Sequence, residues 1–386
     1  MVLPVNLSFL MNKPTGISTY ARQVARYLGV LEPVFLAAER PRFAESAEFS
    51  ESAEFSELDR PTEPAEPAGS SKGHYPIAAG MTPEQGARGH AKRLLWTQFS
   101  LPRICRQLGG RALFSPLPEA PLGAIDPKFR YAVTAHDLTP LRFPQKATPL
   151  LAYQKFYVPA VLRRADRVLA VSETTARDLR SFFEVDTAKI EVIPLAYDRG
   201  LYRDRDLERS NYFVYVGRQE PYKNLDRVVR ALALMPEEAE LHIVGGIDRR
   251  YAPALQQRAR ELGIEHRLKF RGYLSEAELP EAIGRAIALV FPSLWEGFGL
   301  PILEAMACGT PTIVSDFGAM AEVAGDAALS IDPYSVGAIA SAMQRLWSSG
   351  MLREQLRAAG LARVRRFSWE QTGRATCEAL EFLVEG

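Results

Sequence analysis

Residues 286–315 read AIALVFPSLWEGFGLPILEAMACGTPTIVS, and this stretch decides the fold. Two apolar runs, 286–293 and 310–315, lie on either side of a helical segment that begins at Leu300. Pro301 suits a helix start, because the first helical residues have no intrahelical N–H bond to lose. Short apolar runs separated by a helix are typical of buried parallel strands joined by a helical crossover.

The same alternation continues through the second half of the chain. The apolar runs are YFVYVG (212–217), LHIVGG (241–246) and LKFRGYL (268–274), and the helical stretches are 225–235, 252–262, 276–285, 300–308 and 336–347. Strands that are apolar on both faces predict a parallel sheet with helices on each side. The second half is therefore expected to form a doubly wound α/β domain.

The first half alternates less regularly, with expected strands at 5–9, ALFSPL (112–117), YAVTAHDL (131–138), RVLAVS (167–172) and IEVIPL (190–195). Because 386 residues exceed the roughly 250–300 over which one core grows, two domains are expected. We place a first Rossmann-like domain at 1–195, a second at 196–365, and at 366–386 a C-terminal helix that packs back on the first. Open parallel sheets bind ligands beyond the carboxyl ends of their strands, so two facing domains make a cleft.

Composition argues against several classes of protein. The formal net charge of +1 argues against a nucleic-acid binder. Three scattered cysteines are too few for a disulfide framework or a zinc site, which fits a reducing cytosol. The opening residues, MVLPVNLSFLMNK, lack the features of a signal peptide, and no apolar run approaches the eighteen or so residues of a spanning helix. A cytoplasmic protein is expected, with any membrane contact peripheral.

One segment fits neither sheet. The hexamer SAEFSE occurs twice in tandem, at 46–51 and 52–57, and a Pro-Glu-Ala run follows. This composition cannot bury a core, so residues 41–73 are expected to form a mobile acidic loop; a binding site for a specific partner is the alternative. Without residues 41–69 the formal charge rises to about +7, which suits an anionic ligand or a membrane surface, although evenly solvated faces explain the same total.

The junction between the apolar run and the helix at Leu300 carries Glu296 and Glu304. Gly297 and Gly299 let the backbone approach a ligand closely, and the free N–H groups of a helix start attract anions. Carboxylates accept hydrogen bonds from hydroxyl groups, so the pair can hold a polyhydroxylated, phosphorylated ligand. The structural alternative is a strand-turn-helix in which Glu304, placed in the first helical turn, only favours the helix dipole.

A second strand-to-helix junction, YVGRQEPYKNLDRVVRAL (215–232), carries two cations. Arg218 and Lys223 follow the strand end and precede a helix, where they can clamp a diphosphate. An exposed arginine and lysine are more often simply solvated. Combined with the two glutamates, however, they indicate a nucleotide diphosphate joined to a sugar.

At this level of detail the chain resembles the retaining family 4 glycosyltransferases of GT-B fold. The resemblance rests on KPTGISTYARQVARYL (13–28), VTAHDLTPLRFP (133–144), RVLAVSETTARDL (167–179), VGRQEPYKN (216–224), the E-x7-E motif EGFGLPILE (296–304) and RFSWEQT (366–372). The order and spacing of these segments make the resemblance specific. Within the family the chain looks most like bacterial mannosyltransferases of surface-polysaccharide synthesis.

The resemblance implies a role for each matching residue of the second domain. Glu296 is expected to bind hydroxyls of the donor sugar and Glu304 the ribose. Arg218 and Lys223 fall on the diphosphate clamp. Backbone amides near Phe298, Gly299 and Leu300 would meet the sugar and the phosphates, while Gly272, Tyr273 and Leu274 would border the base.

In the first domain the resemblance places four more residues in the cleft. Gly16 lies where the family has a glycine loop near the donor phosphates, although PTGIS has one glycine where many relatives have two. His136 falls on the family's active-site histidine and is expected to contact the transferred sugar or the acceptor, with Asp137 beside the acceptor. A histidine at a strand end is more often structural. Ser172 matches a further cleft position.

The reaction implied is transfer of a hexose with retention, without a metal ion or cofactor, since the nucleotide sugar is a co-substrate. GDP-mannose is the expected donor, and UDP-glucose or another UDP-hexose is the alternative. The acceptor is a saccharide or a lipid-linked saccharide. A retaining glycoside hydrolase also needs paired carboxylates, but it has no use for the Arg218 and Lys223 clamp. A noncatalytic sugar-nucleotide-binding module is the remaining alternative.

Residues 91–111, AKRLLWTQFSLPRICRQLGGR, are both basic and apolar. One interpretation is a core helix, broken near Pro102, that turns its apolar side chains inward (Leu94, Leu95, Phe99, Ile104 and Leu108) and its basic side chains to water (Lys92, Arg93, Arg103, Arg106 and Arg111). The other is a cationic amphipathic surface that binds the cytoplasmic leaflet of a membrane beside the acceptor.

Overall fold

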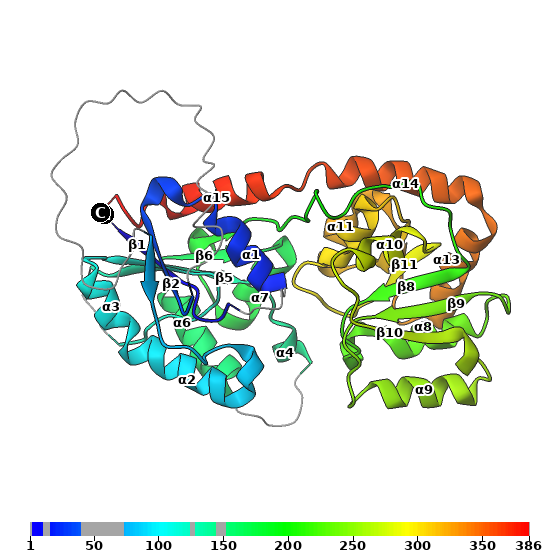
Figure 1. Cartoon of the computed structure of the whole chain (residues 1–386), viewed down its shortest axis with the longest axis horizontal. Helices are drawn as coiled ribbons and strands as arrows, with labels where there is room; N and C mark the ends of the chain where they lie inside the picture. Colours follow the sequence, from blue (N-terminus) through cyan, green and yellow to red (C-terminus); the bar gives the residue numbers. More distant parts are fainter. Residues whose placement is uncertain (1, 11–15, 40–72, 124–127, 144–151, 386) are drawn as a thin grey trace.

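The structure is a computed structural model that describes residues 2–10, 16–39, 73–123, 128–143 and 152–385. The described residues form two parallel sheets, one of seven strands and one of six. In both sheets the strand order reverses beside the first strand, as in a doubly wound fold. The predicted α/β class with two Rossmann-like sheets is therefore confirmed. Figure 1 shows the two sheets in opposite halves of the molecule.

The first sheet has the order β3-β2-β1-β4-β5-β6-β7. Its strands are β1 Leu3–Asn6, β2 Pro33–Ala37, β3 His74–Pro76, β4 Ala112–Ser115, β5 Arg130–Ala135, β6 Arg167–Ala170 and β7 Ile190–Val192. Its helices are α1 Gly16–Ala25, η1 Gly29–Leu31, η3 Pro83–Gln85, α2 Gly86–Phe99, α3 Leu101–Gln107, α4 Thr139–Arg142, the π-helix η4 Tyr153–Tyr157, α6 Val158–Arg164, α7 Glu173–Phe183 and η5 Thr187–Lys189.

The second sheet has the order β10-β9-β8-β11-β12-β13. Its strands are β8 Tyr212–Val216, β9 Glu240–Val244, β10 Leu268–Gly272, β11 Ala288–Phe291, β12 Thr312–Ser315 and β13 Leu329–Ile331. The helices that follow are η6 Pro221–Lys223, α8 Leu225–Leu232, α9 Ala252–Glu261, η7 Glu265–Arg267, α10 Glu278–Gly284, α11 Leu300–Ala307, α12 Gly318–Ala324, η8 Gly325–Ala327, α13 Val336–Ser348, α14 Gly350–Val364 and α15 Trp369–Glu381.

The central strands of both sheets are buried along their whole length. Every residue of β4, β11 and β12 is buried, and Phe114 and Phe213 have no exposed surface. Helices on both faces exclude water from such strands, which is why they appear in the sequence as uninterrupted apolar runs. The carboxyl ends of these strands are consequently rigid points from which the loops extend.

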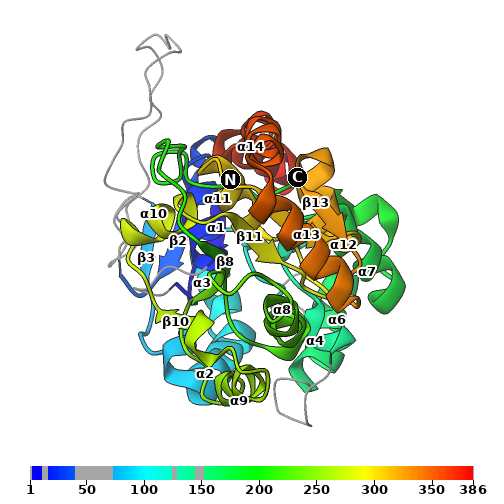
Figure 2. The same ribbon diagram turned by 90° about the vertical axis from the view of Figure 1, so that its right-hand side faces the viewer.

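The last helix returns to the first sheet. Helix α15 packs on α1 and β6, and a Cβ atom built on Gly373 would lie 2.2 Å from Cδ2 of Tyr27. The Thr372 hydroxyl donates to the Pro194 carbonyl (2.7 Å) and Arg130 Nη1 donates to the Phe382 carbonyl (2.9 Å). Helix α14 instead packs on α11 of the second sheet. Figure 1 shows α14 and α15 in one line across both halves, and Figure 2 shows the second sheet from its outer side.

Several elements differ from those predicted. The strand expected at 5–9 ends at Asn6, because Asn6 Oδ1 accepts hydrogen bonds from the backbone N–H (3.2 Å) and the hydroxyl (2.8 Å) of Ser8 and so turns the chain. Strands β2, β3 and β13 are not among those expected; β3 and β13 span three residues each, too few to show a period. The acidic loop predicted at 41–73 falls almost entirely outside the described residues.

The segment 91–111 fits neither interpretation fully. Arg93, expected to face water, is buried, because its guanidinium donates to the Glu119 carboxylate (2.7 and 2.9 Å) and to the Met81 carbonyl (3.0 Å). Leu95 and Phe99, expected to pack inward, are instead 61% and 64% exposed on α2. A charged side chain is thus buried here and two apolar side chains are exposed, which periodicity alone cannot predict.

Candidate functional site

The carboxyl ends of the two sheets meet at Gly297, in the loop after β11. A Cβ atom at this position would lie 1.7 Å from the backbone oxygen of His136, which follows β5. The Gly297 carbonyl also accepts hydrogen bonds from the hydroxyls of Ser172 (2.6 Å) and Thr175 (3.1 Å) at the start of α7. Only glycine permits this approach of the two backbones, and the site forms around it.

Glu296 and Lys223 form an ion pair at the switch point of the second sheet. The Lys223 Nζ lies 2.6 and 2.8 Å from the two carboxylate oxygens of Glu296. The two residues follow β11 and β8, which are neighbours in the sheet although far apart in sequence. Lys223 is therefore not the exposed cation that was expected, because its side chain is only 14% exposed and already has an anionic partner.

Arg218 lies at the mouth of the same site. It follows β8 directly, its side chain is 74% exposed, and its nearest carboxylate is that of Glu220 at 3.8 Å. The Tyr215 hydroxyl donates to the Arg218 carbonyl (2.6 Å) and anchors the backbone. The guanidinium is thus an accessible cation on an anchored backbone, suited to an anionic ligand.

Asp137 faces this charged pair from the first domain. Burial raises the pKa of the Asp137 carboxyl; Thr139, which donates from its backbone N–H (2.6 Å) and its hydroxyl, lowers it, and Glu296 raises it while Lys223 lowers it. Asp137 is therefore close enough to the ion pair to be influenced by both of its members. The cleft between the sheets accordingly contains charged groups from both domains.

His136 is held as a neutral imidazole. Its Nε2 lies 2.9 Å from the Pro116 carbonyl, which can only accept, so Nε2 carries the proton and Nδ1 remains an acceptor. Burial lowers the pKa of His136 to about 4, although the Pro116 carbonyl favours the charged form. The Tyr20 ring packs edge-on against the imidazole, with ring centroids 4.7 Å apart.

A cavity of about 190 Å³ lies beside His136 and Asp137 in the first domain. Most of its lining is apolar and comes from Ile17, Leu117, Leu138, Leu141 and Val158. Tyr153 and Gln154, from η4, add polar side chains. The Tyr153 hydroxyl donates to Glu119 (3.0 Å), so the buried Arg93–Glu119 pair fixes one wall of the cavity.

Glu304 does not lie in the first turn of its helix, as was expected. It is the fifth residue of α11, whose first turn has no acidic residue. Burial raises the pKa of the Glu304 carboxyl from 4.5 to about 7, and a hydrogen bond with Tyr202 partly opposes that shift. The interpretation of Glu304 as a simple helix-dipole partner is therefore wrong.

The remaining predicted residues lie at the edges of the cleft. Gly299, with φ of 104°, precedes α11, and its neighbour Phe298 is buried. Gly16 begins α1 and faces Leu300, since a Cβ atom built on Gly16 would lie 3.4 Å from Leu300 Cδ1. Ser172 caps α7 and turns its hydroxyl toward Gly297, so both its donor and its acceptor are already used.

Gly272 ends β10, an edge strand of the second sheet, and Tyr273 and Leu274 follow it. Tyr273 is exposed there. Strand β9 lies between β10 and β8, which precedes Lys223, and both β9 and β8 lie between β10 and β11, which precedes Glu296. Their contact with a base stays a prediction.

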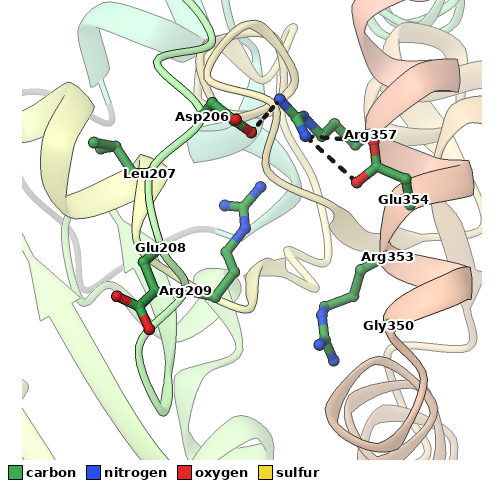
Figure 3. A pocket seen from close by; sticks show the side chains of 8 residues that line it. All are labelled: Asp206, Leu207, Glu208, Arg209, Gly350, Arg353, Glu354 and Arg357. Atoms are coloured by element: carbon green, nitrogen blue, oxygen red, sulfur yellow. Dashed lines mark hydrogen bonds and ion pairs between the residues drawn. The ribbon is translucent and has the colours of Figure 1, made fainter.

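Another pocket, of about 400 Å³, lies away from this cleft, between residues 206–209 and α14 (Figure 3). It adjoins the Asp-x-Asp triplet Asp204–Asp206, a pattern whose carboxylates can bind divalent ions. Here Arg357 pairs with Asp204 (2.7 Å) and Asp206 (2.8 Å), so both carboxylates already have a cationic partner. Arg209 donates to the carbonyls of Gly284, Ala286 and Gly309, a structural use of its guanidinium.

Two family models match the chain, one over most of the first sheet and the other over the whole of the second. The model described as Glycosyltransferase Family 4 matches residues 14–200, and the model described as Glycosyl transferases group 1 matches residues 203–363. These ranges meet in the connection between β7 and β8.

The chain is also similar to individual proteins. It is 29% identical to the O-antigen chain mannosyltransferase B of Escherichia coli, over 66% of this chain and 71% of that protein. It is 34% identical to the O-antigen chain mannosyltransferase RfbU of Salmonella typhimurium, over 52% of this chain and 56% of that protein. Among solved structures, HepE of Anabaena in complex with UDP-glucose has a TM-score of 0.70 at 18% identity, with 99% of each chain covered. The last similarity concerns the fold alone.

The raised pKa of Glu304 predicts a pH-dependent effect of Glu304→Gln. Because the pKa is higher in the folded chain than in the unfolded chain, this carboxyl stabilises the fold most below pH 4.5, and the contribution is lost as pH rises through about 7. Glutamine stays neutral, so the melting temperature of the variant relative to the parent should increase between pH 5 and pH 8. Differential scanning fluorimetry measures this, with exposed Glu261→Gln as the control. If the melting temperatures of variant and parent differ by the same amount at both pH values, the raised pKa of Glu304 is contradicted.

Proposed function

The chain belongs to the family 4 glycosyltransferases, and on that premise we propose that it transfers a hexose from a nucleotide diphosphate to an acceptor hydroxyl with retention. The observation that carries the proposal is the Glu296–Lys223 pair, held at the switch point of one sheet and facing Asp137 and His136 of the other. Open α/β sheets bind their ligands at such switch points.

The donor would be bound by the second domain. Its diphosphate competes with Glu296 for Lys223 and also meets Arg218, so the phosphates gain two cations and the Glu296 carboxylate is released to accept hydrogen bonds from sugar hydroxyls. The free N–H groups before α11 add further donors. Glu304 would hold the ribose from the second turn of α11.

In the transfer step the bond from the anomeric carbon to the phosphate oxygen breaks, and a bond to the acceptor oxygen forms on the same face. The leaving phosphate oxygen receives the acceptor proton. Negative charge develops on the leaving diphosphate, and Arg218 and Lys223 would stabilise it without a metal ion. Stabilisation of the transition state by these preorganised charges is the main catalytic contribution that we assign to the protein.

The acceptor would be bound by the first domain. His136 offers an acceptor nitrogen, Nδ1, and the carboxylate of Asp137 can accept a hydrogen bond from a sugar hydroxyl. The cavity beside them provides an apolar surface of suitable size for part of a saccharide. We infer a saccharide or lipid-linked saccharide as the acceptor.

Mannose from GDP-mannose is the proposed donor, supported by the two O-antigen mannosyltransferases that the chain resembles. A UDP-hexose is the second candidate, because a solved structure of HepE, which shares the fold, contains UDP-glucose. A donor screen that follows the release of each nucleoside diphosphate, with EDTA present and with or without added saccharide, tests both. We expect GDP release that depends on the acceptor and persists in EDTA.

No release from any donor would contradict the proposed transfer. Equal release with and without an acceptor would indicate hydrolysis. Loss of activity in EDTA that magnesium or manganese restores would contradict the metal-free mechanism.

Arg218→Ala should lower kcat/KM by about 10²–10³-fold, the usual cost of removing one group that stabilises a developing anion. The melting temperature should stay unchanged, because the side chain is mostly exposed and has no core contact. Arg230→Ala, on α8 of the same domain, is the matched control, because it removes another exposed arginine, one that pairs with Asp226. Steady-state kinetics that give equal kcat/KM for parent and Arg218→Ala would remove Arg218 from the diphosphate site.

We also propose a peripheral contact with an anionic bilayer through α2. Within the described residues no helix is both long and apolar enough to cross a membrane. Leu95 and Phe99 are four residues apart, so they share one exposed face of α2, and Lys92, Arg103 and Arg106 are exposed on α2 and α3. An apolar face beside basic residues is the composition that binds anionic lipid surfaces.

A double variant, Leu95→Asp with Phe99→Asp, should lose this binding while the fold is retained, because neither side chain is in the core. Sedimentation with vesicles of phosphatidylglycerol and phosphatidylcholine at low salt measures it. Met351→Asp, which changes an apolar side chain that is 75% exposed on α14, is the control and should still bind. If the parent does not sediment with these vesicles, the proposal of a bilayer contact is wrong.

A further inference from the structure

Helix α7 belongs to the first domain, but its N-terminal half contacts the second domain. At its start, the Glu322 carboxylate of α12 accepts hydrogen bonds from the backbone N–H groups of Glu173 (2.8 Å) and Thr174 (3.1 Å). A carboxylate at a helix N-terminus is favourable because it meets unpaired N–H groups and the positive end of the dipole. Figure 2 shows α7 and α12 side by side. Glu322 thus caps a helix of the other domain.

Further along α7, Asp178 contacts the donor loop itself. Asp178 Oδ2 accepts a hydrogen bond from the indole Nε1–H of Trp295 (2.9 Å). Arg142, at the end of α4, donates to the same carboxylate through Nη2 (2.6 Å) and Nε (3.3 Å). The Asp178 side chain is only 3% exposed, so neither contact is a loose surface pair.

The Arg142 guanidinium also lies over the Trp295 ring, 3.6 Å from its centroid. The indole is therefore held twice by the first domain, through its N–H and through its face. Trp295 immediately precedes Glu296, the carboxylate paired with Lys223. The held indole therefore restrains the backbone directly before Glu296.

We propose that Asp178 is a positioning residue of the first domain that orients Glu296 in the second domain through Trp295. This inference rests on the proposed transferase function, in which Glu296 contacts the donor sugar. Because α4 follows the His136–Asp137 segment directly, Arg142 makes the acceptor side of the cleft part of the same arrangement. The donor glutamate is then in place only when the two domains are docked.

A purely structural alternative is that buried Asp178 and partly exposed Arg142 form an ion pair that only stabilises the domain interface. The two interpretations differ in what a variant changes. A structural pair would affect the melting temperature but leave turnover of the folded enzyme unchanged. A positioning residue would lower kcat, while the diphosphate, which is bound by Arg218 and Lys223 without help from Trp295, keeps its affinity.

The experiment compares Asp178→Asn and Trp295→Phe with the parent. Asparagine keeps an acceptor for the indole but loses the charge that holds Arg142, and phenylalanine keeps the ring but loses the N–H donor. We expect kcat to fall by about 10–100-fold in both variants, the scale of a small misplacement in an active site. The dissociation constant of the nucleoside diphosphate, from calorimetry, should not rise by more than about threefold over that of the parent, because the two cations are untouched.

Glu191→Gln is the matched control. It removes another carboxylate paired with an arginine of the first domain, Arg167, at 3.2 Å, and it lies on β7, an edge strand of the first sheet. It should leave kcat unchanged. If Asp178→Asn does not fold, Trp295→Phe still tests the proposal, because it removes no charge from the interface.

Unchanged kcat in folded Asp178→Asn and Trp295→Phe would overturn the proposal, even if their melting temperatures fall. If the parent turns over no nucleotide sugar, the proposed function fails instead, and hydrogen exchange of residues 295–300 still tests the positioning. Faster exchange there in Asp178→Asn than in Glu191→Gln supports it, and equal exchange overturns it.

Discussion

The approach of Gly297 to the backbone of His136 is the constraint on which the rest of the site depends. A single methyl group at position 297 would overlap the His136 carbonyl, so the two domains can dock in this way only because the side chain is absent. The docking brings together the loops after β5 and β11. Glu296 then lies beside Gly297, and His136 and Asp137 lie opposite.

This docking also sets the electrostatics of the cleft. Glu296 and Lys223 neutralise one another at 2.6 Å, and Asp137 lies within the influence of both. An incoming diphosphate would change that balance, since it offers Lys223 a stronger partner and leaves a carboxylate free beside the sugar. Arg218, exposed at the mouth, has its nearest carboxylate among the described residues at 3.8 Å, in Glu220. Lys223 is thus paired with a carboxylate inside the cleft, while Arg218 is exposed to solvent.

Much of the fold and part of the site could be predicted from the sequence. Buried parallel strands appear as unbroken apolar runs, and charged residues just after such runs lie at the carboxyl ends, which is how Lys223 and Glu296 could be placed in one cleft. Their direct pairing could not be predicted, because it depends on the loop conformations. The burial of Arg93 depends on Glu119, and the contact of Asp178 with Trp295 joins residues 117 positions apart. Periodicity contains no information on such pairs.

The return of α15 to the first sheet means that the chain crosses between the domains twice, near Pro194–Tyr202 and again near Arg365–Ser368. These crossings are joined to one another, since Arg199 donates to the carbonyls of Arg365 (3.4 Å) and Phe367 (3.3 Å), and Thr372 donates to that of Pro194. Two bodies linked by a single tether can twist, slide and swing. Two adjacent, cross-linked connections form a hinge, and rotation of one domain about the line through both connections is then the least restricted movement. The cleft would then open by swinging about that line, and each closure would return Gly297 to the same place.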